Sequence, residues 1–211
     1  MAPSELDEKT EDKILNAAYD VFLNKGKSGT RMQEIADTAG VNKALLHYYY
    51  RSKDLIYKAV FKRVFKDFFK DFLSEIDFSL PFKDLLSRFI SNHIKAVGSR
   101  QSLARFFFSE AWMNPDEFMS IFREYLNLSG EPLFSVFIKR FHQAVEDKEI
   151  RQTDPVSFLL NVIILDVFYF IASPIFFTLI GLPGKERKRI TEQRPEEVFI
   201  FVWESIRYKG E

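Results

Sequence analysis

A short stretch between positions 42 and 51 carries side chains that could bind a polyanion. If this stretch is a helix, its lysine, histidine, tyrosine and arginine point outward, where their N–H and O–H groups can donate hydrogen bonds. Phosphate oxygens and base edges in the major groove of DNA accept such bonds. The chemistry that these residue types indicate is therefore recognition of duplex DNA. The outward positions are Asn42, Lys43, Ala44, His47, Tyr48 and Arg51.

Two short helices joined by a tight turn would position this face. The amphipathic run 32–39 is followed by Gly40, which tolerates the left-handed backbone that often ends a helix, and Asn42 is suited to cap the second helix. Thr30 and Gln33 have the spacing of a capping box. A plain helical corner could share this turn, but the caps, the small residues and the exposed basic face together favour a helix-turn-helix. The helices are expected to touch through Ile35, Ala36, Ala39, Val41, Leu46 and Tyr49.

The run GTRMQEIADTAGVNKALLHYYYRSKDLIYKAV resembles the N-terminal DNA-binding domain of TetR-family transcriptional regulators. The motif resemblance covers residues 14–60, and beyond them only length and helical pattern are similar. It implies a regulator, most often a repressor, that binds a palindromic operator as a homodimer. His47 stands where the family often has tyrosine, and Tyr48 where histidine or another aromatic is common, so no base preference carries over. The predicted DNA contacts are Thr30, Arg31, Gln33, Asn42, Lys43, Ala44, His47, Tyr48, Arg51 and Lys53.

Composition bounds the rest of the chain. Its 211 residues are 46% hydrophobic, which suffices for a DNA-binding domain and a larger helical domain. The absence of cysteine excludes disulfides and thiolate metal sites. The formal net charge is zero, but residues 13–53 carry seven lysines and arginines against three carboxylates, so DNA binding is expected to weaken with salt. The acidic, polar N-terminus lacks the pattern of a secretory signal, and we expect a cytoplasmic protein.

The helical pattern has no competing strand-like alternation, so the predicted class is all-α. We expect a disordered arm over residues 1–10, a three-helix helix-turn-helix domain over 11–52, and a larger helical effector-binding and dimerisation domain over 53–211. The helix that would read DNA, at positions 42–51, is called the reading helix. Ser52 is expected to cap the helix that follows it, and residues 181–194 are expected to form a solvated loop. Besides the reading helix, the predicted helices cover 11–25, 32–39, 53–76, 80–98, 102–113, 115–127, 131–149, 155–179 and 195–208.

The most apolar stretch, residues 158–182, is long enough to cross a membrane. Asn161, Asp166 and Pro174 argue against a span, because an ionised carboxylate in lipid is costly. A helix buried in a core and a subunit interface explains the same hydrophobicity. The resemblance implies that this helix and the last one form a four-helix bundle across a two-fold axis. The predicted dimer contacts are Phe158, Val162, Val198, Phe199, Val202 and Ile206.

The chain has 24 phenylalanines, two tryptophans and eight tyrosines, more aromatic volume than a small helical core needs. Each of them could be ordinary core, but together they favour an apolar cavity for a hydrophobic or aromatic small molecule. Asp166 is the sharpest polar candidate because a buried carboxylate needs a partner, which could be the ligand, the other subunit or an internal cation. The predicted ligand contacts are Phe106, Trp112, Phe118, Phe122, Phe137, Phe141, Asp166 and Phe170.

Enzyme chemistry finds no support in the sequence. The three histidines are scattered without metal-ligand spacing, and neither a glycine-rich phosphate loop nor a nucleophile motif occurs. We therefore expect no catalytic residues, no cofactor and no metal. The predicted function is ligand-responsive transcriptional regulation, and the alternative is a helical protein–protein adaptor that uses an aromatic surface.

Overall fold

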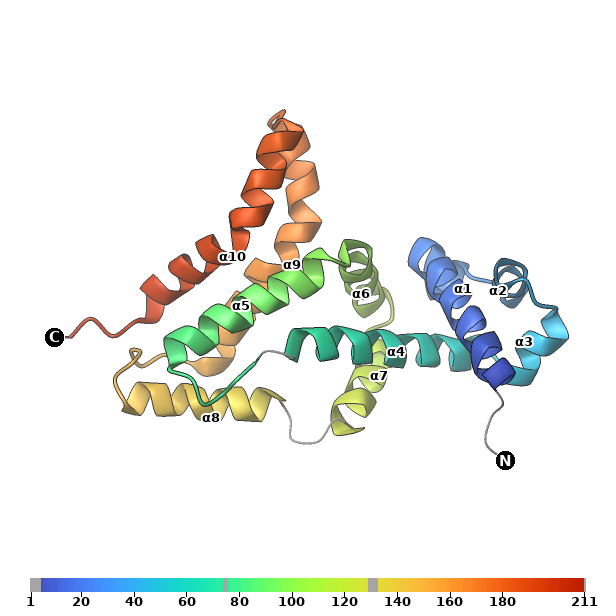
Figure 1. Ribbon diagram of the computed structural model, residues 1–211, viewed down its shortest axis with the longest axis horizontal. Helices are drawn as coiled ribbons and strands as arrows, with labels where there is room; N and C mark the ends of the chain where they lie inside the picture. The colour runs from blue at the N-terminus through green and yellow to red at the C-terminus, as the bar shows by residue number, and fades with distance from the viewer. Residues whose placement is uncertain (1–4, 74–75, 129–132, 211) are drawn as a thin grey trace. The chain divides into compact units, whose positions relative to one another are not determined.

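The computed structural model describes residues 5–73, 76–128 and 133–210, and in these residues ten helices follow one another without a β-strand (Figure 1). The predicted all-α class is therefore confirmed. The helices are α1 (Glu5–Gly29), α2 (Met32–Ala39), α3 (Lys43–Tyr49), α4 (Lys53–Leu73), α5 (Phe82–Gly98), α6 (Gln101–Met113), α7 (Pro115–Leu128), α8 (Leu133–Glu146), α9 (Pro155–Leu179) and α10 (Gly184–Ile206). Residues 5–10, predicted to be disordered, form the first turns of α1, and residues 1–4 of that arm lie outside the described residues.

The chain divides into two compact units. Unit 1 comprises Met1–Asp67 and Arg105–Leu128, and unit 2 comprises Phe68–Ala104 and Ser129–Glu211. The predicted boundary after residue 52 thus differs from the division in the structure, where most of α4, most of α6 and all of α7 belong with the helix-turn-helix. Aromatic packing explains the grouping, because the Phe65 ring on α4 stacks on Phe107 of α6 with ring centroids 4.7 Å apart.

The core of unit 1 begins on α1, where apolar side chains recur at helical spacing. Ile14, Ala18 and Phe22 are completely buried. The Phe22 ring meets the edge of Tyr57 on α4, with centroids 5.1 Å apart. Tyr57 packs in turn on Phe61, so α4 is tied to α1 through a continuous set of rings.

Unit 2 is built around α5, which packs against α8, α9 and α10 (Figure 1). Its core combines the inward faces of these helices with the last turns of α4. Phe82, at the first position of α5, lies fully buried against Phe137 and Phe141 of α8. Glu149 accepts the Phe82 backbone N–H at 2.6 Å and also binds Arg140, so the start of α5 is held by a charged pair.

The prediction of a loop over residues 181–194 is wrong from Gly184 onward, because α10 begins there and continues through Pro195. Proline removes one backbone hydrogen bond but does not have to start a helix. The lysine, arginine and glutamate residues before it favour helix, and Arg189 pairs with Glu186 one turn away. Arg187 donates to the carbonyl groups of Phe177 and Leu182, which satisfies the C-terminal end of α9.

Gly98, the last residue of α5, lies against the Phe170 ring, and a Cβ atom there would be 2.9 Å from the ring carbon Cζ. We expect Gly98→Ala to lower the free energy of unfolding by about 2 kcal/mol, because the packed ring must move to admit the methyl group. Urea denaturation measures the change. Gly184→Ala is the matched control, since a Cβ atom there would have no atom within 4 Å and alanine favours helix. Equal stabilities of the two variants would contradict the predicted close packing.

Candidate nucleic-acid interface

The turn between α2 and α3 has the geometry predicted for it. Gly40 adopts the left-handed backbone, with φ 65° and ψ 33°, and its N–H donates to the carbonyl of Asp37. The Asn42 side chain accepts the backbone N–H of Leu45 at 2.8 Å and so caps α3. Ser52 caps α4 in the same way through Leu55. These three predictions are confirmed.

The predicted capping box at the start of α2 is wrong. Arg31 occupies the cap position, and its side chain makes no capping bond. The Thr30 hydroxyl instead donates to the carbonyl of Gly26 at 2.7 Å, and the Gln33 amide donates to Asp37 within α2. Thr30 is used to close the turn that precedes α2, because Gly26 brings its carbonyl within reach.

The predicted contact positions between the two helices are partly or fully buried. Ile35, Ala36 and Leu46 have no exposed surface, whereas Ala39, Val41 and Tyr49 are half-buried. The pairing of α2 with α3 therefore leaves the opposite face of α3 in solvent.

Most of the predicted DNA contacts are exposed to solvent, whereas two of them contact each other inside the fold. Tyr48 has 78% of its surface exposed, which is unusual for a large aromatic residue in a folded chain. Thr30 is buried, and the Lys53 ammonium donates to the Thr30 carbonyl at 3.1 Å. Both residues therefore stabilise the fold at the start of α2 and of α4. The exposed group comprises Arg31, Gln33, Asn42, Lys43, Ala44, His47, Tyr48 and Arg51.

Tyr49, the last residue of α3, and Tyr50, which follows it, connect α3 to α1 through their hydroxyl groups. The spacing of these tyrosines in the sequence did not predict this role. The Tyr50 hydroxyl donates to Glu11 at 2.7 Å, and the Tyr49 hydroxyl to Asp7 at 3.0 Å. Burial, followed by the hydrogen bond to Glu11, raises the pKa of Tyr50, so its hydroxyl stays a donor at neutral pH. Both partners precede α3 by about forty residues, and only the folded arrangement brings them together.

The fold and this site define a helix-turn-helix protein with a larger all-helical remainder. Residues 14–60 match the model of the family described as "Bacterial regulatory proteins, tetR family". This match concerns the helix-turn-helix part of the chain, which is similar to the DNA-binding domain of that family.

Relatives are similar over different lengths of the chain. The regulator RutR of Escherichia coli K12 is 51% identical over 47 residues, which is 22% of this chain and 22% of RutR, so the match spans about a fifth of that relative. IcaR of Staphylococcus epidermidis, a negative transcriptional regulator of the biofilm operon icaADBC, is 29% identical over 87% of this chain and 94% of IcaR.

Solved structures show that the fold extends over nearly the whole chain. A TetR-family regulatory protein from Rhodococcus RHA1 superimposes with a TM-score of 0.69 at 16% identity, covering 92% of this chain and 97% of that one. The TetR-family regulator HI0893 from Haemophilus influenzae has a TM-score of 0.67 at 14% identity, covering 97% and 100%. At these identities the similarity concerns the fold alone.

The predicted ligand contacts fall into both compact units. In unit 1, Phe118 and Phe122 stack with ring centroids 6.2 Å apart and Phe106 is buried, whereas Trp112 has 79% of its surface exposed. The predicted residues of unit 2 are Phe137, Phe141, Asp166 and Phe170. Each unit by itself therefore holds only part of the predicted set.

Asp166 has its partner inside unit 2. Its Oδ2 lies 2.8 Å from Nδ1 of His93 on α5, and the aspartate is completely buried. Its Oδ1 receives no hydrogen bond from the residues that the structure describes. Burial raises the pKa of the Asp166 carboxyl, and His93 and the Arg194 guanidinium act in the opposite direction.

This shift gives Asp166 a signature in the pH dependence of stability. Above the ordinary pKa of 3.8, the folded protein retains a proton that the unfolded chain has released. The free energy of unfolding of the wild type relative to Asp166→Asn should therefore fall as pH rises from 3.8 to the raised pKa, and then level off. Urea denaturation of both proteins over a pH series measures this difference. Parallel pH profiles would contradict the raised pKa.

Most of the predicted dimer contacts lie in the core of unit 2. Phe158, Val162, Val198, Val202 and Ile206 are buried in the core of unit 2, and the half-buried Phe199 stacks on Trp203 of its own helix. The five buried residues have little surface left for a second subunit, whereas Phe199 keeps part of its surface exposed. Because α9 is apolar around most of its circumference, its sequence did not show which side faces the core. The apolar residues that remain exposed on α9 and α10 include Val156, Leu160, Ile164, Phe168, Ile200 and Phe201.

An open groove of about 310 Å³ continues this exposed apolar surface. The residues lining the groove are Ile164, Leu165, Phe168, Tyr169, Ala172, Ser173, Phe176, Phe177 and Arg194.

The length and hydropathy of α9 would allow this helix to cross a membrane. This is weak evidence for a span, because core helices of soluble proteins pass the same test.

Proposed function

We propose that the protein is a cytoplasmic transcriptional regulator that binds a palindromic operator as a homodimer and is released by a hydrophobic or aromatic small molecule. The observation that carries the proposal is the exposed face of α3, which follows a left-handed glycine and a side-chain cap in a domain that matches the tetR family. Lys43, His47, Tyr48 and Arg51 contact the operator, and repression is the mode supported by the similarity to IcaR.

A second copy of the chain is the partner that this function needs. One reading helix contacts too few bases for high specificity, whereas two related by a two-fold axis read both halves of a palindrome. Leu160, Ile164 and Phe168 recur every four residues on α9 and are about half exposed. We assign this stripe, together with the groove beside it, to the dimer interface, because burying it removes apolar surface from water.

Small-molecule control would act on the spacing of the two reading helices. A ligand that binds one conformation of the dimer better than another lowers operator affinity only by that preference. The phenylalanine clusters of both units support an apolar or aromatic effector. Asp166 is a candidate to orient it through the oxygen that has no partner among the described residues, and Asp166→Asn should then change effector response more than operator affinity.

Selection from random duplex DNA tests the function directly. Purified protein is incubated with the pool at low salt, where phosphate contacts are strongest, and the bound DNA is sequenced over several rounds. We expect a palindrome whose half-sites lie about one helical turn or a multiple apart. A pool without an enriched motif would overturn the proposal and favour an adaptor that binds proteins.

A further inference from the structure

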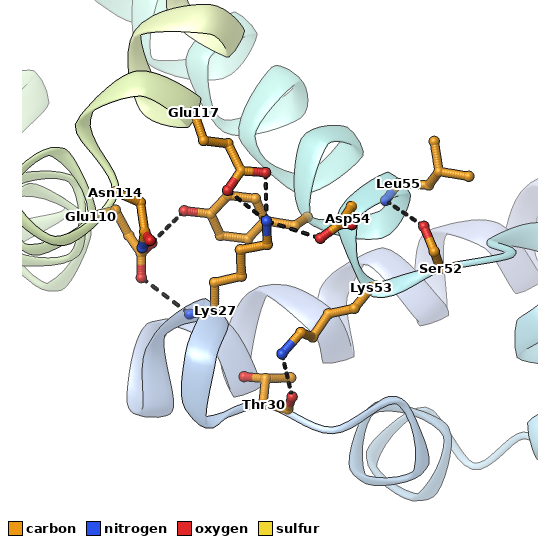
Figure 2. Close-up of polar contacts among 10 residues, drawn as sticks. Lys27, Thr30, Ser52, Lys53, Asp54, Leu55, Glu110, Asn114 and Glu117 are labelled. Carbon is orange, nitrogen blue, oxygen red and sulfur yellow. Dashed lines mark hydrogen bonds and ion pairs between the residues drawn. The ribbon is translucent and has the colours of Figure 1, made fainter.

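Side chains from three later helices hold the turn that leads into the helix-turn-helix (Figure 2). The turn begins at Gly26, where α1 is kinked, and runs to Thr30, and Arg31, the N-cap residue of α2, follows it. Residues from α4, from α6 and from the start of α7 reach it, all of them within unit 1. The start of α2 is thus fixed by segments far along the chain.

Glu110 on α6 is the central acceptor of this arrangement. The residue is only 3% exposed, and its carboxylate accepts hydrogen bonds from three donors. Its Oε1 accepts the backbone N–H of Lys27 at 3.1 Å, and its Oε2 accepts the Tyr57 hydroxyl at 2.6 Å and the Asn114 amide at 3.0 Å. A buried carboxylate needs several such donors. Glu110 therefore ties the α1–α2 turn to α4 and to the end of α6.

Gly26 makes room for this contact. Its φ of 66° lies in the region that favours glycine, and a Cβ atom there would be 3.1 Å from Oε1 of Glu110. The kink at Gly26 presents the next N–H group, that of Lys27, to the carboxylate. The backbone of the turn and the Glu110 side chain are thus matched to each other.

The Lys27 ammonium makes a second connection at the same point. Its side chain is 15% exposed and lies 2.5 Å from Glu117 on α7 and 2.9 Å from Asp54 on α4. Burial lowers the pKa of Lys27, but the hydrogen bonds and charges of Glu117 and Asp54 outweigh this effect and raise it. The ammonium therefore stays charged, and one cation joins α7 and α4 to the turn.

We propose that Glu110 and Glu117 are positioning residues for DNA reading, which set the orientation of α2 and α3 by holding Lys27. This inference rests on the proposed function, because operator affinity is the property it explains.

Because these residues are negatively charged, the direction of the change in DNA affinity on their removal distinguishes a positioning role from an electrostatic one. Removing a carboxylate near a DNA-binding surface should strengthen binding to a polyanion, if electrostatics alone decides. Loss of a positioning contact should weaken it, because α3 then occupies the productive orientation for a smaller fraction of the time. The two explanations therefore predict opposite changes.

The test compares Glu110→Gln and Glu117→Gln with the control Asp116→Asn, which removes the same charge from an exposed residue at the start of α7. Affinity for the selected palindrome is measured by fluorescence anisotropy at fixed salt, at a temperature where circular dichroism shows full helicity. We expect about tenfold weaker binding for Glu110→Gln, a smaller loss for Glu117→Gln, and equal or tighter binding for Asp116→Asn. If Glu110→Gln does not fold, Glu117→Gln carries the test.

A double-mutant cycle separates positioning from general stability. If Glu117 acts through Lys27, Glu117→Gln should cause no further loss of affinity in a Lys27→Met background. A purely structural role would lower the melting temperature while leaving the affinity of the folded protein unchanged, and that result would overturn the proposal. So would equal affinities of Glu117→Gln and Asp116→Asn. If the wild type itself selects no DNA sequence, the proposed function fails instead.

Discussion

Replacing Tyr48 with alanine is expected to lower operator affinity by about a hundredfold while the protein remains dimeric. Tyr48 has 78% of its surface exposed on α3, so its removal takes away a contact without opening a cavity. A homodimer presents the residue twice on each operator, and the loss in binding free energy doubles accordingly. Anisotropy titration with the selected palindrome measures the affinity, and light scattering measures the mass.

Two comparisons make this result specific. Tyr208→Ala removes an exposed tyrosine outside the helix-turn-helix and should leave affinity unchanged. Lys43→Ala should weaken binding and also reduce the slope of log affinity against log salt, if the ammonium contacts a phosphate, whereas a base contact would reduce discrimination between sequences. Loss of the dimer in Tyr48→Ala would remove this residue from the DNA face.

Short-range features of the fold could be predicted because their causes lie within a few residues. Gly40 ends α2 and Asn42 caps α3 through bonds to neighbours three or four positions away. The same reasoning failed at Pro195, where a proline typical of a helix start lies inside α10. Propensity and ion pairs of the preceding charged residues outweighed the single lost hydrogen bond.

Long-range features could not be predicted because nothing in the local sequence specifies the partner. The Glu110 carboxylate meets the Lys27 N–H across 83 positions, and His93 meets Asp166 across 73. The need for a partner was predictable for Asp166, since burial of a carboxylate is costly, but its identity was not. Which side of α9 faces the core was equally hidden, because apolar residues surround the helix and no polar face marks the outside.

Replacing Phe168 with glutamate is expected to convert the dimer to a monomer and to lower operator affinity by more than about a hundredfold. The ring is half exposed in the folded chain and lines the groove beside the α9 stripe. A carboxylate there stays hydrated in the monomer, but it would lose much of its water when two apolar stripes meet. The monomer then binds only half of the palindrome.

Phe108→Glu is the matched control, since this phenylalanine on α6 is 52% exposed against 51% for Phe168. It should remain dimeric and bind the operator, and both variants should keep the helicity of the wild type. Val162→Ala completes the comparison, because Val162 is buried in the core of unit 2 and its truncation should lower stability without changing the mass. If Phe168→Glu stays dimeric, the α9 stripe is not the interface. The two-fold axis that the palindrome requires must then pass through another surface.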